Sequence, residues 1–113
     1  MPLRAPPPQV AFLVDRAVPG LLPEFISRVN RIRGITAATS WWRSPEQNAS
    51  VGGKRDSQHL FGLGADLVGD NERILRDARA LGLIAVDEGS HVHVQGWPRG
   101  VARESGFLAF LGL

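Results

Sequence analysis

The sequence predicts an α+β domain in which helices pack on one side of a small, mostly antiparallel β-sheet. Apolar residues recur at the helical spacings of three and four in residues 21–33 and again in residues 71–81. Two short apolar runs, residues 83–86 and 91–95, flank a Glu-Gly-Ser turn and predict a β-hairpin. A chain of 113 residues is long enough for one such domain but not for two, so we expect a single domain over residues 1–113.

The N-terminal part begins with a proline-rich segment, residues 1–8, which we expect to be extended or mobile. Residues 10–14 form a short apolar run that is compatible with a strand or with the approach to a helix. The helix over residues 21–33 has arginines toward its end, where positive charge suits the helix dipole. Gly34 is the expected C-terminal cap of that helix.

The middle of the chain alternates between predicted strands and loops. Residues 35–42 are rich in Thr and Trp and predict a strand. Ser44 and Pro45 are typical of the cap and first position of a short helix, although a polar loop fits as well. A loop over residues 48–56 and a short ordered turn over residues 58–60 are expected next.

The last third of the chain completes the predicted sheet and ends in an apolar tail. Residues 65–68 predict a strand, Asp70 is the expected N-cap of the helix over residues 71–81, and Gly82 ends that helix. The tail, residues 107–113, reads FLAFLGL. Packing of this tail on the core is favoured over a role as a docking segment for a partner or a neighbouring subunit, because apolar segments are usually buried.

Composition restricts the chemistry that the chain can carry. Cysteine is absent, which excludes disulfides, thiolate metal ligands and a cysteine nucleophile, so any metal site must use His, Asp or Glu. The net charge is only +2 and the arginines are scattered, which argues against nucleic acid as a partner. No apolar run reaches the length of about 18 residues that a membrane span needs. Residues 1–8 also lack the apolar segment of a signal peptide.

All three histidines lie in two short stretches. His59 and Asp66 are seven residues apart with Gly62 between them, a spacing that suits a loop bending back on itself. His91 and His93 would point to the same face of a strand, because side chains alternate with period two. Two imidazoles and one carboxylate make a three-ligand zinc site that leaves a position for water. The spacing alone also fits ordinary surface or core histidines, since short motifs often arise by chance.

Four sequence blocks occur in order along the chain: SWWRS at residues 40–44, NASVGG at 48–53, SQHLFGLGAD at 57–66 and HVHV at 91–94. With these blocks the chain resembles the zinc D-alanyl-D-alanine carboxypeptidase family, which includes peptidoglycan-cleaving phage endolysins and shares its fold with hedgehog-type domains. The resemblance covers residues 40–95, about half of the chain. The family often has Trp where His91 stands, and one branch has Glu in place of Ser90.

The resemblance implies a site and a reaction. His59, Asp66 and His93 are the implied ligands of Zn²⁺, on the open face of the sheet. The implied activity is that of a zinc metallopeptidase, a hydrolase that cuts an amide bond in peptidoglycan stem peptides as a D,D-carboxypeptidase or an L,D- or D,D-endopeptidase. Arg43 is implied to bind the substrate carboxylate or the developing oxyanion. A structural salt bridge from Arg43 to Glu46 is the alternative.

The general base is open among neighbouring residues. His91 ranks first, because strand alternation places it beside His93, and Glu88 and Asp87 follow. Ser57 and Gln58 precede a ligand, so we expect them to hydrogen-bond the substrate or to orient His59. The three tryptophans of the chain either line the cleft or belong to the core: Trp41, Trp42 and Trp97.

Action on a bacterial cell wall without a signal peptide requires another route of delivery, and a phage particle or a holin would provide one. The alternative function is a catalytically silent zinc-bearing module that binds the wall or forms part of a virion. In that case residues 107–113 are the expected contact with a phage or virion partner.

Overall fold

The structure of the chain is a computed structural model that describes residues 3, 6–17, 19–53 and 58–96. It confirms the α+β class. The described residues form α1 (Pro8–Ala17), α2 (Leu21–Asn30), β1 (Ile35–Ser40), α3 (Pro45–Ser50), the 3₁₀ helix η1 (Gln58–Phe61), β2 (Gly64–Gly69), α4 (Asn71–Ala80), β3 (Ile84–Asp87) and β4 (Val92–Gln95). The apolar tail and Trp97 lie outside the described residues.

The four strands form one sheet in the order β1-β2-β4-β3, and every neighbouring pair is antiparallel. Asp66 of β2 pairs with His93 of β4, and His93 pairs with Val86 of β3. Because paired residues share a face of the sheet, these three side chains lie in one row across it. The predicted hairpin of β3 and β4 is confirmed, and its bend is closed by the backbone bond from Glu88 N–H to the His91 carbonyl at 2.9 Å.

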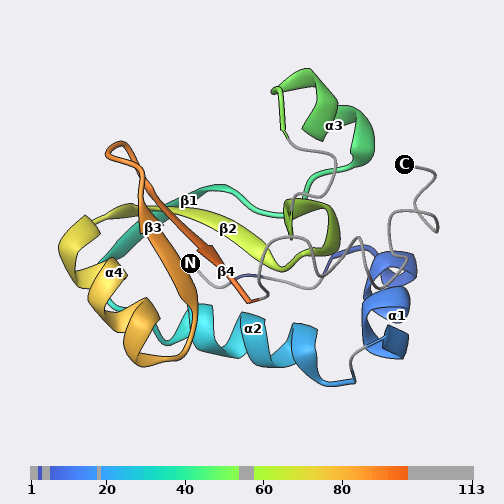
Figure 1. Cartoon of the computed structure of the whole chain (residues 1–113), viewed down its shortest axis with the longest axis horizontal. Helices are drawn as coiled ribbons and strands as arrows, with labels where there is room; N and C mark the ends of the chain where they lie inside the picture. The colour runs from blue at the N-terminus through green and yellow to red at the C-terminus, as the bar shows by residue number, and fades with distance from the viewer. Residues whose placement is uncertain (1–2, 4–5, 18, 54–57, 97–113) are drawn as a thin grey trace.

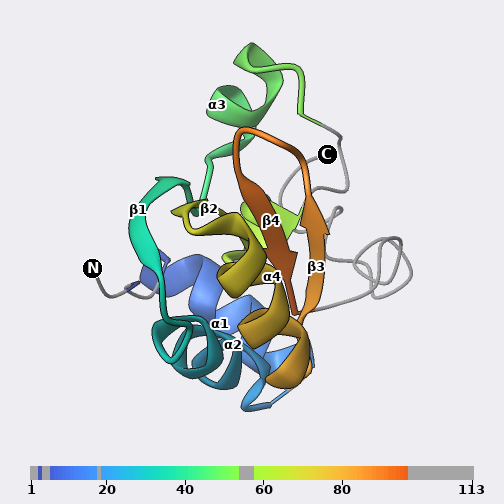
Figure 2. The ribbon, with the colours of Figure 1, turned by 90° about the vertical axis from the view of Figure 1, so that its left-hand side faces the viewer.

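One face of the sheet is covered by helices and holds the core. The strands contribute buried residues at alternate positions, and α2 and α4 meet them with one buried stripe each. In Figure 1, α2 runs beneath the sheet, whereas α3 projects on the opposite side, and Figure 2 gives the same arrangement. The core residues on these elements are Phe25, Val29, Leu67, Ile74, Ala78, Val92 and Val94. The helical layer is therefore made without α3.

Helix α2 ends at Asn30, earlier than the predicted Arg33. The Arg31 and Ile32 N–H groups bond three residues back, which tightens the chain out of the α-helix. The backbone N–H of Arg33 then donates to the Asp77 carboxylate of α4 at 3.1 Å. The contact with α4 replaces the last helical turn.

The described residues of the N-terminal part contact the rest of the domain. Leu3 is 6% exposed, and its N–H donates to the Asn30 side chain at 2.8 Å. The run at residues 10–14 lies within α1, where Val10 and Val14 are buried one helical turn apart. Burial of the Leu3 side chain and its hydrogen bond place the chain against α2 at this residue.

The strand predicted over residues 35–42 ends at Ser40, because the two tryptophans leave the sheet. Trp41 stacks on Phe25 with ring centroids 5.8 Å apart, and the Trp42 indole donates to the Leu60 carbonyl at 3.1 Å. The helix predicted at Ser44 is confirmed, with a full capping box. It extends to Ser50, so the loop begins later than predicted.

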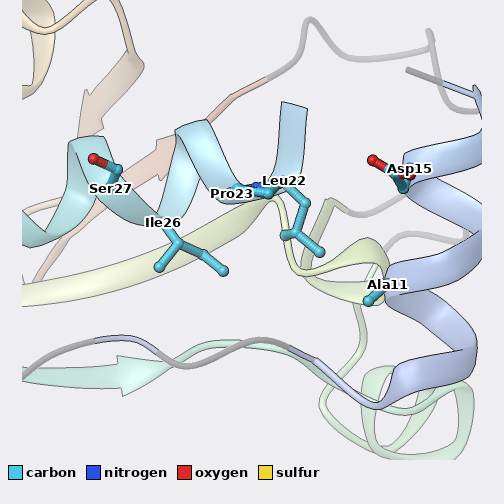
Figure 3. Close-up of a pocket in the computed structure, with 6 residues that line it drawn as sticks. All are labelled: Ala11, Asp15, Leu22, Pro23, Ile26 and Ser27. Atoms are coloured by element: carbon cyan, nitrogen blue, oxygen red, sulfur yellow. The ribbon is translucent and has the colours of Figure 1, made fainter. Parts of the chain in front are cut away.

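A pocket of about 520 Å³ lies between α1 and α2 (Figure 3). Its lining is mostly apolar and includes no histidine. The lining residues are Ala11, Asp15, Leu22, Pro23, Ile26 and Ser27. This pocket is therefore separate from the site described next. Within the described chain, every helix is too short or too polar to cross a lipid bilayer.

Candidate metal centre

The three predicted metal ligands converge in the structure. His59 comes from η1, Asp66 from β2 and His93 from β4. One potential ligand atom from each lies within 4.8 Å of the other two. The His59 and Asp66 side chains are 4% and 12% exposed, and that of His93 is 20% exposed. The cluster lies at the row where β2 pairs with β4, on the face of the sheet away from the core.

The local fold brings His59 back onto the strand that carries Asp66. Gly62 has a φ of +74°, which an L side chain rarely adopts, and it reverses the chain between η1 and β2. A Cβ at Gly62 would lie only 2.9 Å from Pro6, so the turn also needs the space that glycine leaves. The spacing of seven residues predicted such a return of the chain, and the structure confirms it.

The orientation of His59 is set by a backbone carbonyl. Its Nδ1–H donates to the Trp41 carbonyl at 2.7 Å. A neutral imidazole with its proton on Nδ1 has its lone pair on Nε2, and this nitrogen lies 3.4 Å from Asp66 Oδ1. His59 is therefore held in the tautomer that offers Nε2 to a metal.

The His93 ring is oriented the other way round from the His59 ring. Its Nδ1 faces the cluster at 3.0 Å from Asp66 Oδ1, whereas its Nε2 lies 2.8 Å from Gln95 Oε1. The rings of His59 and His93 are tilted by 56° with centroids 5.4 Å apart, so neither stacks on the other. The nitrogen of each ring that faces Asp66 is thus the one available for a shared ion.

The electrostatics of the cluster favour an ionised Asp66. Burial acts to raise the pKa of the Asp66 carboxyl, but hydrogen bonds and charge from His59 and His93 outweigh it and hold that pKa far below its usual range. The hydrogen bond to Asp66 raises the pKa of the His93 imidazole against the opposing effect of burial, and Gln95 and the charge of Glu88 add to the rise. The cluster attracts positive charge, which a proton on His93 or a divalent cation supplies.

The donor set fits zinc. Two imidazole nitrogens and one carboxylate oxygen are ligands that Zn²⁺ prefers, and three protein ligands leave a fourth position for water or substrate. The absence of cysteine from the chain leaves these nitrogen and oxygen donors as its means of holding zinc. His59 Nε2, Asp66 Oδ1 and His93 Nδ1 are the atoms that would hold it.

Arg43 lies beside the cluster and contacts Asp66, not Glu46. Its Nη2 is 3.4 Å from Asp66 Oδ2, on the carboxylate oxygen that faces away from the histidines. Its Nε donates to Ser40 Oγ at 3.0 Å and its Nη1 to Asn48 Oδ1 at 3.3 Å. Arg43 thus makes an ion pair, as the structural alternative expects, but among the described contacts its partner is Asp66 of β2 and not Glu46.

Sequence reasoning missed the roles of Asn48 and Gln95. Asn48 is 4% exposed, and a Cβ at Gly53 would lie 2.1 Å from its Oδ1. The second glycine of the VGG block therefore makes room for the side chain that holds Arg43. The signal for Gln95 was its position two residues after His93, which places both on one face of β4.

The candidate bases lie at the rim of the cluster. His91 is partly exposed, with Nε2 3.7 Å from Asp66 Oδ1 and Nδ1 2.9 Å from the Ser90 hydroxyl. Glu88 is exposed, and its charge reaches His93. Asp87 instead accepts the Gly89 N–H at 2.9 Å and so closes its own turn. His91 is therefore the candidate whose ring nitrogen faces the cluster.

The two remaining predicted substrate contacts are only partly placed. Ser57 lies outside the described residues. Gln58 begins η1, and only its backbone is described. Their assignment to substrate binding stays a prediction.

Of three comparisons with known proteins, the one with protein-family models gave a match. No curated protein and no solved structure matches the chain. A family model described as Peptidase M15 matches residues 24–95, which is more than half of the chain and includes the whole cluster. The chain belongs to the peptidase M15 family, the D-Ala-D-Ala carboxypeptidase-like zinc peptidases.

Proposed function

We propose that this protein is a zinc-dependent peptidase that hydrolyses an amide bond in peptidoglycan stem peptides, as a D,D-carboxypeptidase or an L,D- or D,D-endopeptidase. The observation that carries the proposal is the convergence of His59, Asp66 and His93, with ligand-type atoms within 4.8 Å of one another. Zinc bound there would polarise the scissile carbonyl and lower the pKa of a water molecule. The chain's own residues supply the remaining steps.

His91 is proposed as the general base. When its Nδ1–H donates to the Ser90 hydroxyl, the lone pair lies on Nε2, the nitrogen that faces the cluster. This is the form that accepts a proton from an attacking water and returns it to the leaving amine. Glu88 lies on the adjoining turn and is the second candidate.

Arg43 is proposed to bind the substrate carboxylate. A guanidinium has five N–H donors, and the described contacts of Arg43 are with three acceptors, Ser40, Asn48 and Asp66. The donors that remain suit the carboxylate at the end of a stem peptide. Arg43 would then position the substrate relative to the cluster.

Two exposed aliphatic side chains lie next to the cluster on the same face of the sheet. Val86 and Ile84 pair with His93 and Gln95 and are 48% and 40% exposed. Exposed aliphatic surface beside a reaction centre favours small apolar substrate side chains. The alanine methyl groups of stem peptides fit this surface, and this fit supports the choice of substrate.

Hydrolysis of purified peptidoglycan and of a peptide ending in D-Ala-D-Ala tests the proposal. We expect product release that a chelator abolishes and zinc restores. Exchange of His91 for Ala should then lower turnover about 10²–10⁴-fold with zinc still bound. The matched exchange Glu88→Ala should have little effect. A zinc-loaded protein that cleaves neither substrate would contradict the proposal, and a loss confined to Glu88→Ala would move the role of base to Glu88.

A catalytically silent zinc module that binds the wall or belongs to a virion is the second candidate. Ser90 favours it, because one branch of the family has a glutamate base at this position. Zinc binding together with retention on insoluble peptidoglycan, without cleavage, would identify this function. Under either function we propose delivery to the bacterial wall by a phage particle or a holin, which fractionation of infected cells would test.

A further inference from the structure

We propose that Glu88 binds a cationic side chain of the substrate, which in a stem peptide is that of the diamino acid preceding the two D-alanines. This inference rests on the proposed function and names the substrates that the site prefers. Glu88 is exposed beside the bend that joins β3 to β4. Among the described residues, its carboxylate has no hydrogen-bond or ion-pair partner, so it is available to a ligand.

The register of the hairpin places Glu88 on the face of the sheet that carries the cluster. Val86 pairs with His93, and the Glu88 N–H donates to the His91 carbonyl at 2.9 Å, so the register continues as far as Glu88. Side chains two positions apart share a face, which puts Glu88 beside Val86. The charge of Glu88 also adds to the rise in the pKa of the His93 imidazole that the hydrogen bond from Asp66 mainly causes. The Glu88 carboxylate therefore lies near the cluster.

Glu88 and Arg43 lie on opposite sides of the cluster. The row of Asp66 and His93 begins at Ser40, the last residue of β1, and Arg43 follows that strand directly before α3. Glu88 instead lies at the hairpin bend, which Figure 1 shows at the other end of the sheet from α3. A peptide bound across the cluster therefore meets a guanidinium on one side and a carboxylate on the other.

The spacing along the sheet matches the spacing of residues in a peptide. Glu88 is two positions along and one strand across from His93, which is about 7 Å along and about 5 Å across. An extended peptide rises about 3.3 Å per residue. When the attacked carbonyl is that of the first D-alanine, the residue before it lies one step toward Glu88. The long side chain of a diamino acid covers the remaining distance.

The bend that carries Glu88 is held in place by α4. The Asn71 side chain donates to the Gly89 carbonyl at 2.9 Å and to the Asp87 carboxylate at 3.4 Å. Asp87 in turn accepts the Gly89 N–H at 2.9 Å. The backbone of Glu88 is therefore fixed relative to the cluster, and only its side chain has to be ordered when a cation binds.

The experiment compares two N-acetylated peptides of sequence L-Lys-D-Ala-D-Ala, one with a free side-chain amine and one with that amine acetylated. The variants are Glu88→Gln, which removes the charge, and Glu88→Lys, which reverses it. Glu24→Gln is the control, because Glu24 is exposed on α2, beneath the sheet in Figure 1. The readout is the ratio of kcat/KM for the free amine to that for the acetylated amine. Calorimetry with the same peptides gives the ratio of affinities without turnover, and circular dichroism checks that each variant is folded.

We expect the wild type to prefer the free amine about two- to fivefold, the contribution of an ion pair at an exposed position. The ratio should fall to about one in Glu88→Gln and below one in Glu88→Lys, whereas Glu24→Gln should keep the wild-type ratio. The wild-type preference should also shrink between 0.1 and 1 M salt, because the screening length falls from about 10 Å to about 3 Å. A ratio between two substrates cancels any effect of a variant on the chemical step.

A wild-type ratio of about one, or a ratio that Glu88→Lys leaves unchanged, would overturn the proposal. An equal loss of turnover on both peptides in Glu88→Gln, with the ratio unchanged, would assign Glu88 to proton transfer and overturn it as well. If neither peptide is cleaved, the proposed function fails, but the affinity ratio still decides whether Glu88 binds the cation. Absence of binding by both peptides would refute the two proposals together.

Discussion

At the scale of single residues, Asp66 is the point on which the site depends. One carboxylate oxygen faces His59, His91 and His93 at distances of 3.0–3.7 Å, and the other faces Arg43. A buried carboxylate is costly unless charged or hydrogen-bonding partners surround it, and the Arg43 guanidinium and the His93 imidazole are such partners. The same arrangement that keeps Asp66 ionised also aims three rings at one position. Under the proposed function, side chains around this position would determine which substrates are accepted.

Val86 is expected to influence that choice. Replacing Val86 by Asp puts a negative charge beside His93 and removes aliphatic surface. We therefore expect KM for a peptide ending in D-Ala-D-Ala to rise about tenfold. This is the cost of losing the burial of one to two methyl groups and of repelling the substrate carboxylate. Steady-state kinetics measure this. Val51→Asp is the matched control, because Val51 is 65% exposed at the end of α3 and away from the sheet. Equal effects of the two substitutions would contradict a substrate role for Val86.

At the scale of elements, the segment from β1 through α3 acts as a support for Arg43. The capping box of Ser44 and Gln47 starts α3 directly after Arg43, and α3 contributes Asn48 as an acceptor for the guanidinium. The turn after α3 closes with the Gly53 N–H bonded to the Asn48 carbonyl at 2.8 Å. This element is short, so its position depends on hydrogen bonds more than on buried area.

Gly53→Ala tests this support. The new Cβ would lie 2.1 Å from Asn48 Oδ1, so Asn48 must move and Arg43 loses an acceptor. We expect kcat/KM to fall about tenfold, the equivalent of one hydrogen bond of about 1.4 kcal/mol, with zinc affinity unchanged. Gly52→Ala is the control: nothing lies near its Cβ, and its φ of +70° costs backbone strain alone. A matching loss of activity in both variants would show that the turn, and not Asn48, is responsible.

At the scale of the whole molecule, the sheet divides structure from chemistry. Its covered face packs against α2 and α4 with fully buried Leu67, Val92 and Val94, while its open face carries the cluster. The apolar core and the cluster are therefore on opposite faces of the sheet, and the charged cluster links stability to pH and to zinc.

The metal-free protein should lose stability as pH rises. The pKa of His93 is raised by Asp66, so its stabilising contribution is fully present below the unfolded value of about 6.5 and is lost as pH rises through the folded pKa. The pKa of Asp66 is lowered, so its contribution is lost only in strong acid, below its unfolded value of about 3.9.

Zinc should reverse the trend above pH 6.5, because it competes with the proton on His93. At a zinc concentration a hundredfold over Kd the gain is about 2.7 kcal/mol. Thermal unfolding between pH 5 and 9, with chelator or with zinc, measures both trends. His93→Ala should show neither of them. A metal-free Tm that is flat or rises from pH 6.5 to 8, with the wild-type histidine present, would contradict the coupling of His93 to Asp66.

The sequence predicted the elements whose signal is local. The period of apolar residues identified α2 and α4, Asp70 and Ser44 identified two helix starts, and the Glu-Gly-Ser turn identified the hairpin. The spacing of His59 and Asp66 predicted a loop that brings these two side chains together, and the alternation along β4 predicted that His91 and His93 share a face of the sheet. The resemblance of the four motif blocks to a known family then implied which of these side chains bind a metal. The structure shows His59, Asp66 and His93 gathered in one cluster.

Tertiary structure alone decided the contacts that orient these side chains. The Trp41 carbonyl that accepts from His59 is a backbone group, so its position cannot be predicted from residue type, and the hydrogen bond between Gln95 and His93 was not predicted either. The same holds for the pairing of Arg43 with Asp66 and not with nearby Glu46. Local sequence determines which residues can bind a metal or a proton; the register of strands distant in the chain determines which of their atoms meet.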